Sequence, residues 1–587
     1  MKKINRLLFV FLSFAISITA LADTATVDTP AIIRYNSIHH PVIAKNGMVV
    51  TQNAIATEVG LEILKKGGNA VDSAIATAFA LAVTLPRAGN IGGGGFMLVH
   101  IAKTDQQFAL DYREMAPALA TRDMYLDENG EVDRSRSWFS HQSAGVPGTV
   151  AGMHLAWQEW GSLPWKQLLG PAIRLAKRGM VVTHDLSSNL HSRSERLSKN
   201  PNTKSYLYKR DGSTYQAGEV LRQRDLAKTL TRIARYGAKG FYQGKTADLI
   251  VADMQANDGL ITHADLKNYK PVMREVVTGQ FDVGESNYHI ASMPPPSSGG
   301  VHLIQMLNTL EHLPLQESGH NTGESLHLLV ETMRRAYADR SEHLGDPDFY
   351  EVPVDFLTSE DYAKQVAASI DQARASKSSD IKAVSIPAYE SPDTTHFSIV
   401  DKHGNAVANT YTLNFSYGSG KMVKGGGFML NNEMDDFSSK PGFPNVYGLV
   451  GKEANKIEPG KRPLSSMTPT MVFKNNAEGG KELFMVTGSP GGSRIITAVL
   501  QNILNVTVHG MNVAEATHAP RMHHQWLPDQ VFVEPGISQD SVEELQALGH
   551  QVKGANTMGS IQAIQLIGDY KHGAADPRRP DAKALGY

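Results

Sequence analysis

The sequence of 587 residues contains no cysteine. Disulfide bonds, thiol nucleophiles and cysteine-based metal sites are therefore excluded together. The chain has no block rich in lysine and arginine, and its 57 basic residues stand against 59 acidic ones, so we expect no nucleic-acid partner. Without covalent cross-links the fold must depend on a large apolar core, for which a hydrophobic content of 41% is sufficient.

Common catalytic and nucleotide-binding motifs are also missing. The chain has no HExxH zinc motif and no G-x-S-x-G nucleophile elbow. The four glycines at 92–95 indicate a close approach of the backbone to a neighbour but do not form G-x-G-x-x-G, and Gly240–Thr246 is one residue short of a P-loop. The histidine pairs at 39–40 and 523–524 are adjacent, which sends the two rings of each pair in different directions. We expect neither a metal nor a cofactor.

The N-terminus has the pattern of an export signal. Three basic residues precede the apolar run Leu7–Ala20, which is short for a membrane span and ends at the A-x-A signal Ala20-Leu21-Ala22. We expect a signal peptide over residues 1–22, a mature chain from Asp23, and a periplasmic or secreted protein without membrane insertion. A membrane anchor is the alternative interpretation of the same run.

Local patterns predict several elements. Asn53–Lys66 has helical spacing, and Ala70–Val83 is a run of small apolar residues that indicates a buried helix capped by Asn69. Strands are expected over 96–101, 108–112 and 288–292, and a helix over 493–508.

A change of composition divides the chain. Residues 368–393 are polar and rich in serine, lysine and aspartate, so we expect an exposed connector there. Beyond it, short strand-like runs alternate with turn residues. We therefore predict two segments, 23–393 and 394–587.

The stretch that begins the second segment, SPDTTHFSIVDKHGNAVANTYTLN, raises a question about Thr394. A loop that ends in two β-branched residues is the plain interpretation. The alternative is that Thr394 becomes a chain terminus, because a threonine hydroxyl needs a base and a free α-amine, with a pKa of about 7.7–8.0, supplies one on the same residue. Signal cleavage leaves Asp23, so the alternative requires self-cleavage between Asp393 and Thr394.

Stretches along the whole mature chain match one family. They are, in order, GNIGGGGFML, DYREMAPA, GVPGTVAG, SMPPPSSGG, YADRSEHLGDPDF, TTHFSIVD, TYTLN, LNNEMDDF, KRPLSSMTPT and TGSPGGSR. The chain resembles the γ-glutamyltranspeptidases (glutathione hydrolases), N-terminal-nucleophile hydrolases made as one precursor that cleaves itself. The resemblance implies an α+β fold, a four-layer αββα sandwich to which a large subunit (23–393) and a small subunit (394–587) both contribute.

The resemblance also implies catalytic roles. Thr394 corresponds to the nucleophile of both self-cleavage and catalysis, and Thr412 to a second threonine that orients it. Gly491 and Gly492 correspond to the oxyanion hole, a role that suits backbone N–H groups without side chains. A plain strand residue is the alternative for Thr412.

Substrate-binding roles follow in the same way. Arg113 suits an α-carboxylate because guanidinium pairs with it bidentately, and two serines can add hydroxyl hydrogen bonds. The full set that the resemblance implies is Arg113, Ser465 and Ser466 for the carboxylate and Asn414, Glu433 and Asp436 for the ammonium group. A structural ion pair with Glu114 or another acid is the alternative for Arg113, and a solvated turn is the alternative for Glu433 and Asp436.

The segment 441–451 matches a lid loop in which Tyr447 covers the substrate. The expected reaction transfers the γ-glutamyl group of glutathione or a related amide to water, an amino acid or a dipeptide. We expect the large and small subunits to stay paired after self-cleavage. Two alternatives stay open: a cephalosporin (glutaryl) acylase-like amidase, and an exported solute-binding protein without activity.

Overall fold

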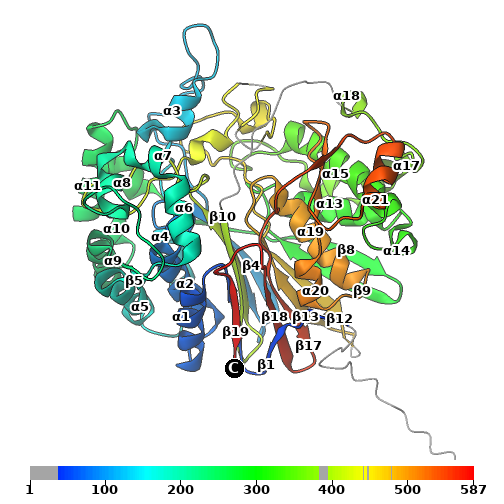
Figure 1. The fold of residues 1–587 in the computed structure, drawn as a ribbon, viewed down its shortest axis with the longest axis horizontal. Helices are drawn as coiled ribbons and strands as arrows, with labels where there is room; N and C mark the ends of the chain where they lie inside the picture. Colours follow the sequence, from blue (N-terminus) through cyan, green and yellow to red (C-terminus); the bar gives the residue numbers. More distant parts are fainter. Residues whose placement is uncertain (1–36, 382–393, 441, 446–447, 477–478) are drawn as a thin grey trace, which may run out of the picture.

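The computed structural model describes residues 37–381, 394–440, 442–445, 448–476 and 479–587. Two seven-stranded sheets lie face to face at its centre, and helices cover the outer face of each (Figure 1). The helices α1, α2, α4, α5 and α9 lie on one side, and α13, α15, α19 and α20 lie on the other. The predicted four-layer αββα arrangement is confirmed.

We name each sheet after a central strand. The β10 sheet has the order β19 (Lys583–Gly586), β2 (Met48–Thr51), β10 (Thr394–Val400), β11 (Ala406–Thr412), β3 (Gly94–Ile101), β4 (Gln106–Tyr112), β7 (Val272–Arg274). The β12 sheet has the order β1 (Val42–Ala44), β18 (Tyr570–Ala575), β17 (Gln562–Ile567), β13 (Lys481–Thr487), β12 (Thr470–Asn475), β9 (Ser286–Ser292), β8 (Val277–Val283). Both sheets therefore combine strands from before residue 382 with strands from after residue 393.

Alternation along the strands creates the layers. Phe397, Ile399 and Val407 pack into the core beneath α1 and α2, whereas Val400 and Ala408 pack toward the β12 sheet. Successive side chains point to opposite faces of a strand, so β10 and β11, buried on both faces, direct apolar side chains toward both cores.

The helices of the two outer layers include most of the longer helices of the described chain. Over the β10 sheet lie α1 (Ala54–Lys65), α2 (Ala70–Thr84), α4 (Thr149–Trp160), α5 (Trp165–Arg178) and α9 (Arg224–Tyr236). Over the β12 sheet lie α13 (Gly299–Leu310), α15 (Gly323–His343), α17 (Glu360–Ala368), α19 (Arg494–Thr507), α20 (Val513–His518) and α21 (Gln539–Ala547). Asn53 accepts a hydrogen bond from the Ala56 N–H, and Asn69 forms a capping box with Asp72, so both predicted N-caps are confirmed.

Shorter elements complete the described chain. The helices are α3 (Arg134–Phe139), α6 (His184–Ser192), α7 (Ser194–Ser198), α8 (Pro201–Leu207), α10 (Lys239–Tyr242), α11 (Lys245–Gln255), α12 (His263–Asn268), α14 (Leu315–Ser318), α16 (Val354–Leu357) and α18 (Ser378–Ile381). The strands are β5 (Met180–Val181), β6 (Val220–Leu221), β14 (Met522–His523), β15 (Val531–Val533) and β16 (Val552–Gly554). Within the described ranges, no helix combines the length and apolar character that crossing a membrane requires.

The expected exposed connector is confirmed in part over 368–381. Most side chains over 368–381 are exposed, but Ser378 is buried and its N–H donates to Asp529 Oδ2 over 2.8 Å. The Ala375 N–H donates to the carbonyl oxygen of Leu548 over 2.8 Å. Polar residues in this stretch are thus fixed by partners beyond residue 394. Residues 382–393, including Asp393, lie outside the described residues.

Candidate active site

Thr394 begins β10 and lies directly opposite Thr412, the last residue of β11. The Thr394 hydroxyl donates to Thr412 Oγ1 over 3.4 Å, and Thr412 Oγ1 also accepts from the Asn414 N–H over 2.8 Å. Both threonines are buried, with 6% and 3% of their surface exposed. The strand register alone therefore places the second hydroxyl beside the first.

The glycine run identified in the sequence packs behind Thr412. A Cβ atom on Gly93 would lie 2.0 Å from the Thr412 carbonyl oxygen, and one on Gly95 would lie 2.4 Å from the Thr410 carbonyl oxygen. The same Thr412 carbonyl accepts from Asn90 Nδ2 over 2.8 Å. The neighbour that these glycines approach is thus β11, and side chains at these positions would push Thr412 out of place.

A buried cavity opens in front of Thr394. It is lined by Arg113, Arg340, Thr394, Thr412, Asn414, Glu433, Asp436, Leu449, Leu464, Ser465, Ser466, Met467, Gly492 and Ile495. Residues that are far apart in the sequence meet here, and they include nearly every residue to which the sequence assigns a role. Four apolar side chains, Leu449, Leu464, Met467 and Ile495, line the cavity between the polar ones.

Arg113 follows β4 and forms ion pairs with three carboxylates. Its guanidinium contacts Glu433 Oε1, lies 2.5 Å from Asp436 Oδ2 and lies 3.5 Å from Glu114 Oε2. Burial alone would lower the pKa of Arg113, but the carboxylates raise it instead. Glu433 is buried and Asp436 nearly so, so the solvated-turn alternative is wrong for both.

The carboxylates in turn respond to burial. Burial raises the pKa of Glu433 and of Asp436, and Arg113 opposes both shifts. Burial raises the pKa of Glu114 to about 7, again against the effect of Arg113. Arg113 and its three carboxylates are thus paired charges in a buried, low-dielectric setting. A ligand can replace one of these ion pairs favourably only if it brings a charge that pairs equally well.

Asn414 adopts a left-handed backbone conformation, with φ of 72°. Asparagine tolerates this region better than most residues. Its side chain lines the cavity, and its Nδ2 donates to the Asn432 carbonyl oxygen over 3.0 Å. The side chain is thereby fixed beside Thr412.

A proline-rich loop at 294–300 holds the two serines. The Ser465 N–H donates to the Pro296 carbonyl oxygen over 2.8 Å, and the Ser298 N–H donates to the Ser465 carbonyl oxygen over 2.9 Å. The Ser297 hydroxyl donates to the Met467 carbonyl oxygen over 2.7 Å. These bonds align Ser465 and Ser466 along the cavity wall.

Gly491 and Gly492 connect β13 to α19. Their φ angles are 137° and 58°, values that side-chain-bearing residues rarely adopt. Gly492 lines the cavity at the N-terminal end of α19, where helix N–H groups and the helix dipole favour negative charge.

Comparison with known proteins identifies the family. The family model for γ-glutamyltranspeptidase matches residues 56–586. The chain is 50% identical over 552 residues to the glutathione hydrolase proenzyme of Escherichia coli (strain K12), covering 94% of this chain and 93% of that protein. It is 38% identical over 571 residues to the glutathione hydrolase proenzyme of Bacillus subtilis (strain 168), with shares of 94% and 93%. The chain belongs to the γ-glutamyltranspeptidase family.

Solved structures give the same result for the fold. Cephalosporin acylase from Bacillus halodurans superposes with a TM-score of 0.80 at 26% identity and covers 95% of this chain and 99% of its own. Helicobacter pylori γ-glutamyltranspeptidase superposes with a TM-score of 0.55 at 42% identity and covers 60% of this chain and 97% of its own. The predicted family and fold class are confirmed.

The structure of this transpeptidase leaves two predicted residues unplaced. Asp393 and Tyr447 lie outside the described residues. Leu449, two positions after Tyr447 in the predicted lid loop, lines the cavity. Gly491 is not among the lining residues but precedes one that is.

Sequence reasoning missed Arg340, a buried cation of the cavity. Arg340 belongs to the stretch YADRSEHLGDPDF that resembles the transpeptidases, but no role was assigned to it. All residues of α15 from Ser325 to Ser341 are buried, so its charged positions over that range show no exposed face. A charge on a helix buried all round is the signal that could have identified Arg340.

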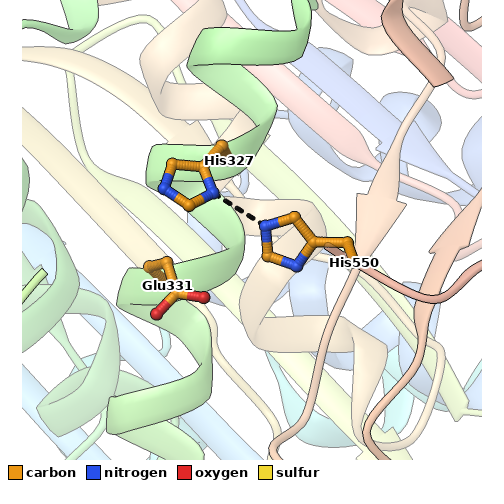
Figure 2. Close-up of side chains that lie close together, drawn as sticks. All are labelled: His327, Glu331 and His550. Atoms are coloured by element: carbon orange, nitrogen blue, oxygen red, sulfur yellow. Dashed lines mark hydrogen bonds between the residues drawn. The ribbon is translucent and has the colours of Figure 1, made fainter. Parts of the chain in front are cut away.

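Away from the cavity, His327 and Glu331 lie one turn apart on α15 and face His550 (Figure 2). Their possible ligand atoms lie within 4.8 Å of one another. His327 Nε2 lies 2.8 Å from the Asp371 carbonyl oxygen, which can only accept, so this nitrogen carries the hydrogen. His327 Nδ1 then accepts from His550 Nε2 over 2.7 Å, and neither nitrogen offers a free lone pair to a cation.

Glu331 is saturated as well. Its oxygens accept from Arg335 over 2.7 Å, from the Ser376 N–H over 3.1 Å and from Arg334 Nε over 3.3 Å. Two guanidinium groups beside the carboxylate also repel a metal ion. We assign this cluster to anchoring the stretch 371–378, and not to metal binding. The rings of His523 and His524 likewise bond different partners, Thr497 and Asp529, as predicted from their adjacency.

Proposed function

We propose that this protein is a self-cleaving γ-glutamyltransferase and glutathione hydrolase whose nucleophile is Thr394. One observation supports this most strongly. The Thr394 hydroxyl lies 3.4 Å from that of Thr412, in a cavity that also contains Arg113 and its paired carboxylates. The named relatives at up to 50% identity are glutathione hydrolase proenzymes, which favours the same reaction here.

Self-cleavage would proceed without a co-reactant other than water. Thr394 Oγ1 attacks the carbonyl carbon of Asp393, the peptide C–N bond breaks, and the proton of the hydroxyl passes to the amine that is released. Water then opens the ester, returning the hydroxyl to Thr394 and leaving a carboxylate on Asp393. The new α-amine serves as the base for later turnovers, since its pKa of about 7.7–8.0 leaves a neutral fraction near pH 7.

The cavity suits a zwitterion. We infer that Arg113, Ser465 and Ser466 receive the α-carboxylate of the γ-glutamyl group, and that Asn414, Glu433 and Asp436 receive its α-ammonium. Arg113 is paired with carboxylates in the structure, so a ligand that brings one charge of each sign can exchange partners without leaving a buried charge alone.

Catalysis then uses the glycines. The Thr394 oxygen attacks the γ-carbonyl, and the N–H groups of Gly491 and Gly492 stabilise the developing oxyanion. The leaving amine takes a proton from the Thr394 ammonium, and the resulting ester is opened by water, an amino acid or a dipeptide. Donors fixed in advance at an oxyanion are each worth about 3 kcal/mol.

We propose further that the mature protein is an exported pair of subunits, 23–393 and 394–587, which remain associated. The relatives' name, proenzyme, and the H. pylori chain, which corresponds to 60% of this sequence, support division into two pieces. The signal peptide 1–22 and a periplasmic or secreted location rest on the sequence pattern alone.

A glutaryl acylase is the second candidate, since the cephalosporin acylase superposes at a TM-score of 0.80. A glutaryl group has no α-ammonium, so it would leave Glu433 and Asp436 without a new partner when it displaced Arg113. The solute-binding alternative gives no reason for a threonine pair at the start of a buried strand.

The test is to express the chain and sequence the N-terminus of the smaller fragment. We expect two fragments, the smaller one beginning at Thr394, and turnover of a γ-glutamyl anilide well above that of the glutaryl anilide. A single uncut chain with full activity would contradict the mechanism, and a preference for the glutaryl anilide would contradict the substrate.

A further inference from the structure

Arg340 reaches the cavity from α15, and its hydrogen-bond partners within the described residues are two serines. Its Nε donates to Ser298 Oγ over 2.9 Å, and its NH2 group donates to Ser466 Oγ over 3.1 Å. Its side chain is buried, with 5% of the residue exposed. Within the described part of the chain, no carboxylate oxygen lies within 4.0 Å of this guanidinium.

The two cavity arginines therefore differ in charge balance. Arg113 contacts Glu433, Asp436 and Glu114, so its charge is compensated before any ligand enters. Among the described residues, Arg340 bonds neutral hydroxyl groups only, and the charge of Asp436, which raises its pKa against the effect of burial, acts on it without forming an ion pair. Burial lowers the pKa of Arg340 to about 10, which still leaves it charged at neutral pH.

Arg340 also determines which way its serine partner can donate. A guanidinium has donors and no acceptor, so Ser466 Oγ must accept from it. The hydroxyl hydrogen of Ser466 is then available, and it has no acceptor among the described residues. Ser298 is polarised in the same way, because its Oγ accepts from Arg340 and donates to the Ser465 carbonyl oxygen over 2.9 Å.

We propose that Arg340 is a positioning residue for the α-carboxylate of the γ-glutamyl substrate, acting by turning the Ser466 hydroxyl hydrogen into the cavity and by adding an unpaired positive charge behind it. This inference rests on the proposed function. It assigns a role to the proline-rich loop as well, since Ser298 fixes the second edge of the same guanidinium.

A purely structural role would give a different result. If Arg340 only joined the loop 294–300 to Ser466, its loss would impair every substrate to the same degree. If Arg340 positions the substrate carboxylate, the decrease in activity on removing Arg340 must depend on the charge of the substrate.

The experiment compares two substrates on matched variants. The substrates are an L-γ-glutamyl anilide and the analogue in which a carboxamide replaces the α-carboxylate. For Arg340→Met we expect kcat/KM on the carboxylate substrate to fall about 10- to 100-fold, mainly through KM, and kcat/KM on the carboxamide to change less than about 3-fold. Arg335→Met is the control, because Arg335 lies on the same helix and bonds Glu331 and Ser369 away from the cavity.

A double-mutant cycle tests the link to Ser466. Ser466→Ala should cost little more in the Arg340→Met background than Arg340→Met alone, because both changes remove the same oriented hydroxyl. Arg340→Lys keeps the positive charge and serves as the test variant if Arg340→Met does not self-cleave. It should raise KM for the carboxylate substrate alone, and by a smaller factor than Arg340→Met.

Equal losses on both substrates, or fully additive effects of Arg340→Met and Ser466→Ala, would overturn the assignment while leaving the proposed function intact. Absence of γ-glutamyl turnover by the wild-type protein would instead overturn the proposed function, and this inference with it.

Discussion

Thr394 and Thr412 face each other as register partners at the ends of β10 and β11, with their hydroxyl oxygens 3.4 Å apart. The contact places a hydroxyl acceptor beside the proposed nucleophile before any cut has been made. The proposed cut precedes Thr394 and not Thr412, so Thr394 is assigned as the nucleophile and Thr412 as the residue that orients it.

Thr394→Ala should give a single chain of precursor size with no measurable γ-glutamyl turnover, since no hydroxyl remains to attack Asp393. Electrophoresis of the purified protein and an anilide assay measure the two effects. Thr395→Val is the matched control: the neighbouring hydroxyl is buried without a hydrogen-bond partner in the described structure, so this variant should cleave itself normally. Efficient cleavage of Thr394→Ala would exclude Thr394 from the processing step.

Thr412→Val should slow self-cleavage and lower kcat about 10- to 100-fold, because Thr394 Oγ1 loses its partner and the Asn414 N–H loses its acceptor. A stability loss of about 1 kcal/mol should accompany the change. Thr412→Ser keeps the hydroxyl and should retain most of the activity, as measured by kcat and by the time course of cleavage. Equal activity of the valine and serine variants would assign Thr412 to the strand alone.

Gly492→Ala should lower kcat about 100- to 1,000-fold, because a methyl group at φ of 58° shifts the backbone N–H proposed to bind the oxyanion. Gly244→Ala shares the positive φ, at 60°, and lies in open space outside the cavity. Both variants should lose about 1 kcal/mol of stability, but only Gly492→Ala should lose activity. A similar kcat for the two would contradict the oxyanion role.

The cluster around His550 predicts acid sensitivity. Burial lowers the pKa of His550 from 6.5 to about 3, so the unfolded chain binds this proton first and stability falls as the pH drops below about 6.5. Burial alone would raise the pKa of Glu331, but Arg334, Ser376 and Arg335 lower it from 4.5 to about 2, so its contribution is lost below about pH 4.5.

Urea unfolding at pH 7, 6 and 5 measures this effect. His550→Gln should flatten the decline in unfolding free energy by up to about 1.4 kcal/mol per pH unit, whereas the exposed His403→Gln should follow the wild type. A chelator should leave the thermal midpoint unchanged, since the cluster is saturated by hydrogen bonds. A drop of several degrees with the chelator would restore the metal interpretation.

Local chemistry made much of the fold predictable. The caps Asn53 and Asn69 and the small apolar residues of α2 specify their helices without help from distant segments. The alternation of polar and apolar residues in β10 likewise predicts a strand from local sequence alone. The expectation for 368–381 was only partly right, because composition does not reveal that serines there bond Arg334, Arg335 and Asp529.

Local sequence patterns could not predict which residues come together in the site. Arg113 meets Glu433 across 320 residues of sequence, a pairing that no periodicity indicates. The family resemblance grouped these residues, and the structure adds which carboxylates pair with the arginine. Arg340 could not be singled out, since α15 is buried from Ser325 to Ser341 and its sequence there shows no solvent-exposed face.

Each of the two sheets combines strands from both sides of the proposed cut, and β10 itself lies between β2 and β11. Breaking one peptide bond before Thr394 would therefore produce two polypeptides that cannot be separated without pulling both sheets apart. In the proposed heterodimer, subunit dissociation and global denaturation would be the same event, because the two subunits would share one core and not a separable interface.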